Sequence, residues 1–441
     1  MNSGRDTICA LASGTAPSAI AIIRVSGPDV ASVSAKLLKR KLRPPGELGL
    51  NTVMDADGNS IDTGLCVFMA GPKSYTGEDT LELNLHGGRY IIEKTLQALH
   101  ELGVRLAEPG EYTRRAFEAG KLDLTQAEAI ADLIEADTEA QHHLARSQLD
   151  GALSQLYTEW GETLTEILAL LEANIDFPDE EDAPEEVFQP ALKKLTALKV
   201  RLQVALEKGG ITERIREGFR LVILGPPNAG KSTLLNRLAR REAAIVTDIP
   251  GTTRDIVEVR LEMGGYLVWL ADTAGLRETQ DRLEQMGVER ARRAAEMADM
   301  RLWLYPGDME YNPDKMIRDD DIIAVNKCDL FTLTDVSREI CQISAVTGAG
   351  VDQLLAKIGK ALQARTARLQ APTLTRLRHR QAIMDTLDHI CQALDQLEHS
   401  YGIELVAETV RRAARAVASL TGKIETEAVL GSVFESFCIG K

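Results

Sequence analysis

The chain has 441 residues and a formal net charge of −15, with 44% hydrophobic and 27% charged residues. This composition excludes an intrinsically disordered chain, and the length exceeds what one hydrophobic core ordinarily holds, so two or three domains are expected. No run reaches the roughly 18 apolar residues that a membrane-spanning helix needs, and the N-terminus lacks the basic-then-apolar pattern of a secretory signal. We therefore expect a cytoplasmic protein without membrane segments.

The cysteines indicate the cellular compartment, and the acidic net charge indicates how the chain could bind nucleic acid. The six cysteines are scattered and form no Cys-x-x-Cys pair, which is typical of a reducing cytosol. Proteins that grip nucleic acid usually carry a basic excess, and this chain carries the opposite. Any RNA must therefore be held by a local basic patch or by a partner protein.

Residues 1–119 mix short β-type runs with Gly/Pro turns. The runs at 19–25 and 65–68 are strand-like, and residues 91–102 form one helical pattern. This mixture predicts a small α+β domain.

Helical periodicity begins at Leu122 and flanks a different central block. Apolar residues recur every three or four positions from 153 to 171, and again over 383–397 and 406–420. The acidic stretch 174–184 is interpreted as a solvated connection, followed by a helix to about Lys208. Residues 217–363 alternate strand and helix patterns. We interpret the chain as one helical domain interrupted by an inserted α/β domain; two independent helical domains are the alternative.

A buried-strand pattern over Phe219–Leu224 runs directly into a phosphate-binding motif. The motif reads Gly225-Pro226-Pro227-Asn228-Ala229-Gly230-Lys231-Ser232. Its glycines let backbone N–H groups wrap phosphates, and the following helix N-terminus adds positive potential. Lys231 is expected to reach the β- and γ-phosphates, and the Ser232 hydroxyl to bind Mg²⁺.

Three further motifs follow in the order expected of a guanine-nucleotide site. They are Asp272-Thr273-Ala274-Gly275, Asn326-Lys327-Cys328-Asp329 and Ser344-Ala345, each after a strand pattern. Asp272 is expected to hold Mg²⁺ through water, and the Gly275 N–H to contact the γ-phosphate. The Asp329 carboxylate can accept from both N1–H and the 2-amino group of guanine, a pair that adenine lacks. Together the motifs predict GTP binding.

The segment 247–255 and the residues after Gly275 concern hydrolysis. A mobile loop at 247–255 normally donates a threonine to Mg²⁺, and Thr253 is the candidate. Leu276 stands where Ras-like GTPases carry a water-orienting glutamine, and leucine cannot do that. Glu284 is a nearby carboxylate able to orient water. Without such a group the chain would be a slow nucleotide-gated scaffold.

The whole chain resembles the bacterial tRNA-modification GTPases of the MnmE (TrmE) family. The motifs that carry the resemblance, besides those of the GTPase block, are Asp6-Thr7-Ile8, Tyr75-Thr76-Gly77-Glu78-Asp79, His86-Gly87-Gly88, Pro109-Gly110-Glu111-Tyr112-Thr113, Lys121-Leu122-Asp123-Leu124-Thr125-Gln126-Ala127-Glu128-Ala129 and Phe437-Cys438-Ile439-Gly440-Lys441. The terminal Cys-Ile-Gly-Lys beside an inserted GTPase block is close to diagnostic.

The resemblance implies a multidomain α/β plus α fold. It consists of an N-terminal α+β folate-binding and dimerisation domain (1–119), a discontinuous helical domain (120–216 and 365–441) and an inserted Ras-like P-loop GTPase domain (217–364). It also implies a homodimer that acts on tRNA together with the flavin-dependent protein MnmG, in a heterotetramer. Together they add an aminomethyl-type group to C5 of the wobble uridine, with 5,10-methylene-tetrahydrofolate as one-carbon donor and 5-formyl-tetrahydrofolate as its analogue.

The resemblance also implies residue roles. GTP contacts are assigned to Asn228, Ala229, Gly230, Lys231, Ser232, Thr233, Thr247, Asp248, Ile249, Pro250, Gly251, Thr252, Thr253, Asp272, Thr273, Ala274, Gly275, Asn326, Lys327, Asp329, Ser344 and Ala345. Mg²⁺ is assigned to Ser232 and Thr253, K⁺ to Asn228, Thr247, Ile249 and Thr252, and folate to Arg24, Glu82, Lys121 and Lys441. Catalysis is assigned to Glu284, Lys231 and Thr253. Hydrolysis is expected to be stimulated by K⁺ and by dimerisation of the GTPase domain.

Two departures and one rival remain. Ser18-Ala19 replaces the usual Gly-Gly pair, and Arg282 stands where acidic residues are frequent. The rival is a ribosome-assembly GTPase of the Era or Der type, but neither a KH domain nor a second GTPase domain is found. The sequence does not reveal which tRNAs are modified, the nitrogen source, the role of Cys438 or how hydrolysis is coupled to modification.

Overall fold

The computed structural model divides into two compact units, Met1–Ala131 with Ala414–Lys441, and Asp132–Ala413. The residues it describes are 6–176, 183–241, 258–272, 295–308, 317–331, 340–367, 374–399, 401–424, 427–435, 437 and 439–440. In these ranges no helix has both the length and the apolar character needed to cross a membrane. The boundaries at residues 119, 216 and 364 stay a prediction.

The first unit is built on a six-stranded sheet in the order β3-β4-β5-β2-β1-β6. Its strands are β1 (Ile8–Leu11), β2 (Ser18–Ser26), β3 (Gly49–Met54), β4 (Ser60–Met69), β5 (Thr80–Gly87) and β6 (Arg105–Leu106). The pairing is antiparallel except between β1 and β6. The strands alternate buried and open positions, as a half-covered sheet requires.

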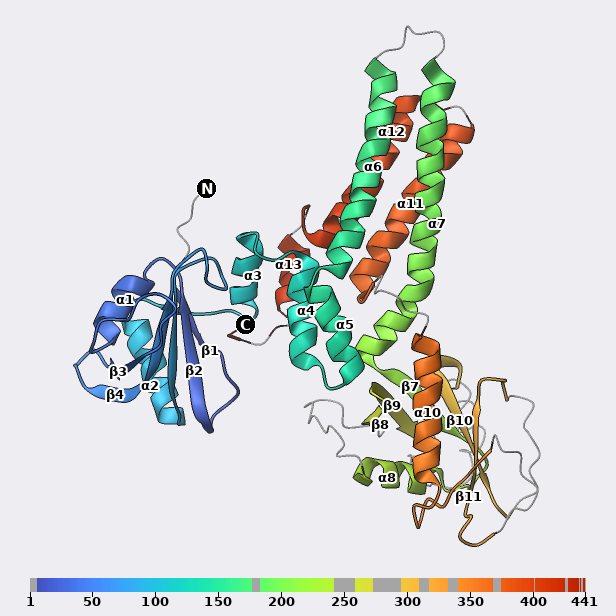
Figure 1. Cartoon of the computed structure of the whole chain (residues 1–441), viewed down its shortest axis with the longest axis horizontal. Helices are drawn as coiled ribbons and strands as arrows, with labels where there is room; N and C mark the ends of the chain where they lie inside the picture. The colour runs from blue at the N-terminus through green and yellow to red at the C-terminus, as the bar shows by residue number, and fades with distance from the viewer. Residues whose placement is uncertain are drawn as a thin grey trace, which may run out of the picture. The chain divides into compact units, whose positions relative to one another are not determined.

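Helices α1 (Val30–Leu37) and α2 (Arg89–Glu101) cover one face of this sheet (Figure 1). Val30, Val33 and Leu99 pack there with Ile23 and Leu81 in one buried cluster. The unit also contains α3 (Glu111–Glu118), α4 (Leu124–Glu135) and, from the C-terminal part of the chain, α13 (Glu427–Phe434). Phe117, Leu124 and Phe434 from these helices share a second apolar cluster. The last residues of the chain therefore fold with its first 131.

The second unit begins with a bundle of long helices. They are α5 (Glu139–Leu149), α6 (Ala152–Asp176), α7 (Ala183–Glu217), α11 (Leu377–Glu398) and the first part of α12 (Ile403–Thr421). Figure 1 shows α6, α7 and α11 side by side. Trp160, Leu164 and Ile167 are buried, as the three-and-four spacing predicted.

Two helix boundaries predicted from the sequence were wrong. Helix α6 extends to Asp176, into the stretch interpreted as a connection, and α7 continues past Lys208 to Glu217. The pair Gly209-Gly210 lies inside α7, although glycine weakens helices. A Cβ on Gly209 would lie 2.2 Å from Cγ of Leu374. This glycine therefore permits close packing and does not end the helix.

The inserted block is a second six-stranded sheet, in the order β12-β11-β10-β7-β9-β8. Its strands are β7 (Phe219–Leu224), β8 (Glu258–Met263), β9 (Tyr266–Asp272), β10 (Met300–Pro306), β11 (Ile322–Asn326) and β12 (Cys341–Gln342). All pairs are parallel except β8 with β9. Helices α8 (Lys231–Arg241) and α10 (Val351–Thr366) pack against its main core. In such sheets ligands bind at the carboxyl ends of the strands.

Candidate functional site

The loop after β7 has the close backbone geometry of a phosphate cradle. Gly225 has φ +140°, and a Cβ there would lie 2.0 Å from the carbonyl oxygen of Leu304. Gly230 has φ +92°, and its Cβ would lie 2.2 Å from Nδ2 of Asn326. Asn228 takes the left-handed conformation at φ 60°. Both glycines of the motif are thus required by space and by backbone angle.

Lys231 and Ser232 open helix α8 directly after this loop. The Lys231 ammonium donates to the carbonyl oxygens of Gly225 and Pro226, both at 2.9 Å. The Ser232 side chain is exposed in the first turn, and Thr233 follows it. A cation, a hydroxyl group and the positive end of a helix therefore meet at one point, which suits an anionic phosphate group with a hard divalent cation.

Asn326 joins the phosphate loop to the base-binding loop. Its Nδ2 donates to the carbonyl oxygen of Ala229 at 2.8 Å, and its Oδ1 accepts from the N–H of Ala345 at 2.8 Å. The side chain is buried, so both hydrogen bonds are made away from water. Two segments 97 and 19 residues away along the chain are thereby held together.

The loop after β11 presents Asp329 to solvent. Lys327 has φ 67°, and its ammonium lies 3.1 Å from Oδ2 of Asp308. The N–H of Cys328 donates to the carbonyl oxygen of Ile343 at 3.1 Å. Asp329 is exposed. Its carboxylate lies outside the core, at the carboxyl end of the strands, where a base would be recognised.

The Ser344–Ala345 loop is braced from two sides. The buried Ser344 hydroxyl accepts from the N–H of Thr347 at 3.0 Å. From α8, Arg237 Nε donates to the Ala345 carbonyl at 2.5 Å, and Nη2 donates to the carbonyl of Val346. Sequence reasoning missed Arg237, since it lies in no motif.

Part of the predicted site lies outside the described residues. These residues are Thr247, Asp248, Ile249, Pro250, Gly251, Thr252, Thr253, Thr273, Ala274, Gly275, Leu276, Arg282, Glu284, Cys438 and Lys441. Asp272 is the last residue of β9, beside β7 in the sheet. Of the predicted GTP contacts, the structure therefore brings together the phosphate loop, Asn326 and Ala345.

A second candidate site lies on the face of the N-terminal sheet opposite α1 and α2. Arg24 and Glu82 are paired across β2 and β5, with Nε and Nη2 of Arg24 each 2.8 Å from Glu82 Oε1. The Arg24 guanidinium lies 5.8 Å from the ring centroid of Tyr75 and 5.6 Å from that of Tyr112. The Tyr112 hydroxyl donates to the Arg24 carbonyl at 2.8 Å. These tyrosines are in the quoted motifs, but no role was assigned to them.

Lys121 and the C-terminal tail lie on neighbouring parts of the same unit. The Lys121 ammonium donates to the carbonyl oxygens of Pro72, at 2.9 Å, and Ser74, in the loop that carries Tyr75. In the tail, a Cβ on Gly440 would lie 2.3 Å from the carbonyl oxygen of Leu11. The tail is therefore docked on β1, the strand that pairs with β2.

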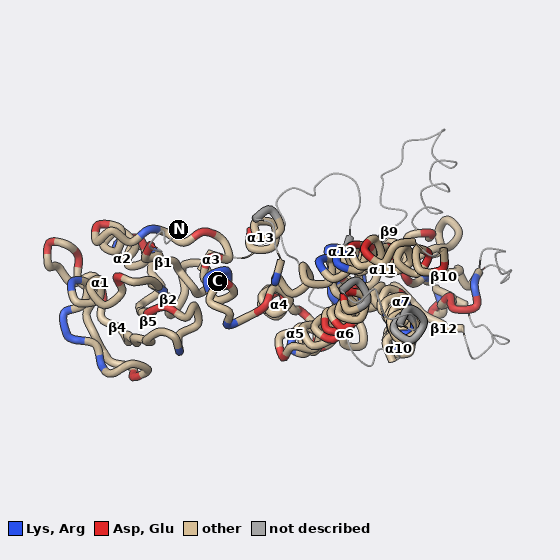
Figure 2. Tube along the Cα trace, turned by 90° about the horizontal axis from the view of Figure 1, so that it is seen from above, with Lys and Arg blue, Asp and Glu red and all other residues tan. Residues whose placement is uncertain are grey.

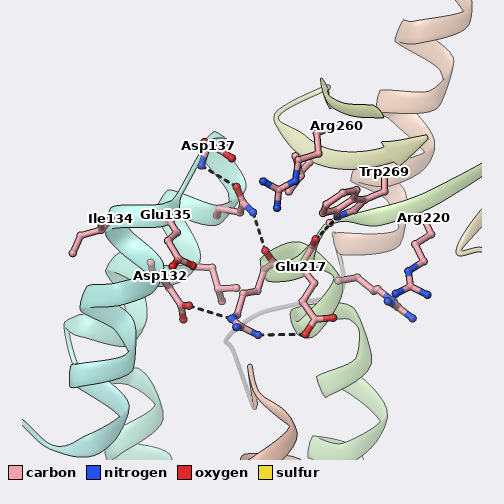
Figure 3. Close-up of a pocket in the computed structure, with 15 residues that line it drawn as sticks. Asp132, Ile134, Glu135, Asp137, Glu217, Arg220, Arg260 and Trp269 are labelled. Carbon is pink, nitrogen blue, oxygen red and sulfur yellow. Dashed lines mark hydrogen bonds and ion pairs between the residues drawn. The ribbon is translucent and has the colours of Figure 1, made fainter. Parts of the chain in front are cut away.

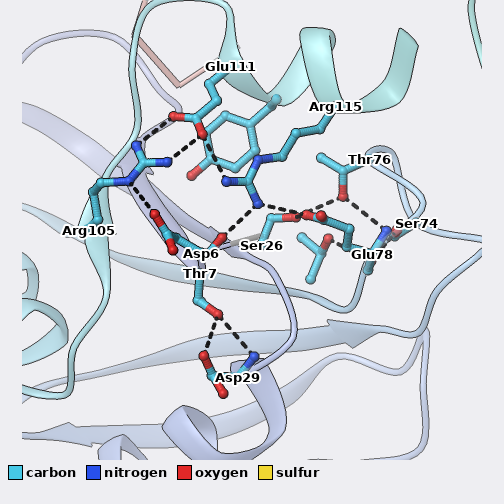
Figure 4. Close-up of polar contacts among 12 residues, drawn as sticks. Asp6, Thr7, Ser26, Asp29, Ser74, Thr76, Glu78, Arg105, Glu111 and Arg115 are labelled. Atoms are coloured by element: carbon cyan, nitrogen blue, oxygen red, sulfur yellow. Dashed lines mark hydrogen bonds and ion pairs between the residues drawn. The ribbon is translucent and has the colours of Figure 1, made fainter. Parts of the chain in front are cut away.

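Ion pairs connect α3 to the same loop (Figure 4). Arg115 donates to Glu78 at 3.0 Å, to Glu111 at 2.8 Å and to the Asp6 carbonyl at 2.8 Å. Arg105 holds both oxygens of Glu111. Burial raises the pKa of Glu111, but hydrogen bonds from Arg105, from the Glu108 N–H and from Arg115 outweigh it and bring the pKa to about 2. Tyr75 and Tyr112 come from the two elements that these pairs connect.

The second unit also holds a pocket of about 650 Å³, apart from the phosphate loop. Figure 3 shows Arg260 against Trp269, with the guanidinium 4.3 Å from the ring centroid. Nearby, Arg216 binds Asp132 at 3.0 Å and donates to the Thr375 carbonyl at 3.4 Å. The pocket lies near the start of β7, whereas Gly225 follows the end of that strand, so it is not the nucleotide site.

The parallel sheet, the glycine loop before α8 and the joined base loop define a P-loop GTPase. Comparison with known proteins agrees with this class and identifies the family within it. The helical domain model of MnmE matches residues 124–438, and the model of the GTP-binding protein TrmE N-terminus matches residues 7–121. The chain belongs to the MnmE family of tRNA modification GTPases.

Relatives of this family align with the chain over almost its whole length. The tRNA modification GTPase MnmE of Hyphomonas neptunium is 52% identical over 438 residues, covering 99% of each chain. That of Phenylobacterium zucineum is 46% identical over 449 residues, covering 99% of this chain and all of the relative. Among solved structures, Aquifex aeolicus Era bound to GDP and AlF4⁻ is 27% identical over 39% of this chain and 66% of its own, with a TM-score of 0.27.

Proposed function

We propose that the chain hydrolyses GTP to drive modification of the wobble uridine of certain tRNAs, in a complex with a flavin-dependent protein of the MnmG type. The group added at C5 is of the aminomethyl or carboxymethylaminomethyl kind. The observation that supports GTP binding is the position of Asn326, whose side-chain amide joins the phosphate loop to the base-binding loop. The proposal that tRNA is the substrate is supported by the names of the full-length relatives.

The chemistry of hydrolysis is divided among few residues. Lys231 neutralises phosphate charge as it builds up, and its contacts with two loop carbonyls are exchanged for phosphate oxygens. Ser232, with Thr253, would hold Mg²⁺, which supplies charge stabilisation at the phosphates. Asn228, with Thr247, Ile249 and Thr252, would hold K⁺, whose charge replaces that of an arginine finger.

The water that attacks the γ-phosphate needs a group to orient it. Leu276 has no polar atom, so we assign this role to the Glu284 carboxylate. Dimerisation of GTPase domains would bring the two nucleotide sites into the active arrangement, in a homodimer and in a heterotetramer with the flavoprotein.

The N-terminal face would bind the one-carbon donor, 5,10-methylene-tetrahydrofolate. Its pterin offers ring N–H donors and its tail offers carboxylates. Glu82 can accept from the former, while Arg24 and Lys121 can bind the latter after exchanging their present partners. The positive charge of Lys441 suits the same anion, and the docked Gly440 supports its delivery to this unit. The scattered thiols support a cytoplasmic location.

Nucleoside analysis tests the function directly. In a strain that lacks this gene, mass spectrometry of tRNA nucleosides should show loss of the modified wobble uridine. Wild-type chain should restore it, whereas Lys231→Ala should not. Unchanged nucleosides in the deletion strain, with altered ribosome profiles, would favour the ribosome-assembly alternative. Full restoration by Lys231→Ala would favour a scaffold that needs no hydrolysis.

A further inference from the structure

A strongly basic segment spans the last turn of α1 and the residues after it, in a chain that is acidic as a whole. Lys36, Lys39, Arg40, Lys41 and Arg43 lie within eight positions, and no acidic residue occurs between Asp29 and Glu47. All five side chains are exposed. Figure 2 shows the blue stretch beyond α1. We call these five residues the basic segment.

Within the described part of the chain, none of the five forms an ion pair with an acidic side chain. Several other cations at the surface do form such pairs. Lys194 lies 2.6 Å from Glu166, and Arg201 lies 2.8 Å from Glu159. The positive potential of the basic segment is therefore not cancelled locally.

The backbone of the basic segment is held in place. The N–H of Lys39 donates to the carbonyl oxygen of Thr52 at 3.0 Å. The buried Asn51 amide binds both the N–H and the carbonyl oxygen of Arg40, at 3.0 and 2.8 Å. Leu38, between the cations, is buried. The charges are thus displayed on an ordered support, which lowers the entropy lost when a ligand binds.

Protection of a sheet edge explains only part of this charge. β3 is an edge strand, and lysines at such edges prevent pairing with other chains. Here, however, the backbone at Lys39 and Arg40 already covers Thr52 and Asn51. Lys41 and Arg43 lie beyond these bonds. The Arg43 side chain passes close to Gly49 of β3, but edge protection does not account for the positive charges of both residues.

We propose that the basic segment is a contact surface for the phosphate backbone of tRNA. A chain of net charge −15 repels a polyanion over most of its surface, so binding requires a local, unpaired group of cations. Contacts of this kind set orientation rather than sequence choice. The inference rests on tRNA being the substrate under the proposed function.

The test compares two full-length variants that each lose four positive charges. One carries Lys39→Gln, Arg40→Gln, Lys41→Gln and Arg43→Gln. The control carries Arg146→Gln, Lys194→Gln, Arg201→Gln and Arg412→Gln, which are exposed cations beside acidic partners. Fluorescence anisotropy with unmodified tRNA, over a range of KCl concentrations, gives affinity and salt dependence.

The basic-segment variant should bind roughly tenfold or more weakly near 0.1 M KCl, and its log–log salt slope should fall by about 3. The control should behave like wild type, and both should hydrolyse GTP normally. Equal affinity and slope in both variants would overturn the proposal. So would retained tRNA affinity with lost sedimentation on phosphatidylserine vesicles, which would identify a membrane contact. If wild type binds no tRNA at all, the substrate assignment itself fails.

Discussion

Arg237 Nε donates a hydrogen bond of 2.5 Å to the carbonyl oxygen of Ala345, which joins the phosphate-loop helix to the base-binding loop. Gly348 allows this approach, because a Cβ there would lie 2.6 Å from Nη1 of Arg237. The guanidinium thus holds the same residue, Ala345, whose N–H donates to Oδ1 of Asn326. We infer that Arg237 positions the base loop without touching the phosphates.

Replacing Arg237 by Ala should raise the KM for GTP roughly tenfold with little change in kcat, because charged hydrogen bonds of about 1.5–3 kcal/mol are lost from binding alone. Steady-state turnover and the dissociation rate of a fluorescent GDP measure this. Arg240→Ala, an exposed cation on the same helix, is the control. A fall in kcat at unchanged KM would contradict the assignment.

Asp329→Asn should change base preference from GTP toward xanthosine triphosphate. The amide can donate to the extra carbonyl of xanthine and no longer accepts from the guanine 2-amino group. Competition binding with the two triphosphates measures the ratio. If GTP remains preferred as strongly as in wild type, Asp329 does not read the base.

Glu284→Ala should lower turnover by roughly 10² while nucleotide affinity stays near that of wild type, because only the orientation of water is lost. Turnover in K⁺ should exceed that in Na⁺ at equal ionic strength. Phosphate release and equilibrium titration separate rate from affinity. Equal rates in the two salts would refute the K⁺ site, and an unaltered rate in the variant would refute Glu284.

Arg24→Ala should weaken binding of 5-formyl-tetrahydrofolate at least tenfold, the effect of one charged hydrogen bond, and leave GTP turnover intact. Calorimetric titration measures the affinity. Lys94→Ala is the matched control, because this cation lies on α2 and its ammonium donates to Gln97 Oε1 at 3.2 Å. Deletion of the last four residues should act in the same direction. Undiminished affinity in both altered chains would place the folate elsewhere.

Glu111→Gln should destabilise the N-terminal unit by about 3 kcal/mol near neutral pH, since a buried ion pair is broken. The folded-state pKa of about 2 lies below the ordinary 4.5. The contribution is therefore present above pH 4.5 and is lost as the pH falls toward 2. Thermal melts between pH 2 and 7 should show the two proteins converging at the acid end. A constant difference across that range would exclude this titration.

The phosphate loop was predictable because local signals agree there. An apolar strand pattern, two glycines and Lys231 lie within thirteen residues, and the structure assembles them as expected. The second role of Asn326 was not predictable, since Ala229 lies 97 residues away. The pairing of Arg24 with Glu82 likewise depends on β2 lying beside β5, although β3 and β4 come between them in the sequence.

The hydrogen bond from Arg216 to the Thr375 carbonyl has a consequence for how this architecture arises. It brings together the point where the chain leaves the helical bundle and the point where it returns. Because entry and exit are neighbours, a gene segment for a GTPase can be spliced into a helical protein without rethreading its bundle. By the same geometry, a short linker between Glu217 and Leu374 should excise the GTPase domain and leave a bundle that still closes. The GTPase domain is, in structural terms, an insertion that can be removed without breaking the path of the helical bundle.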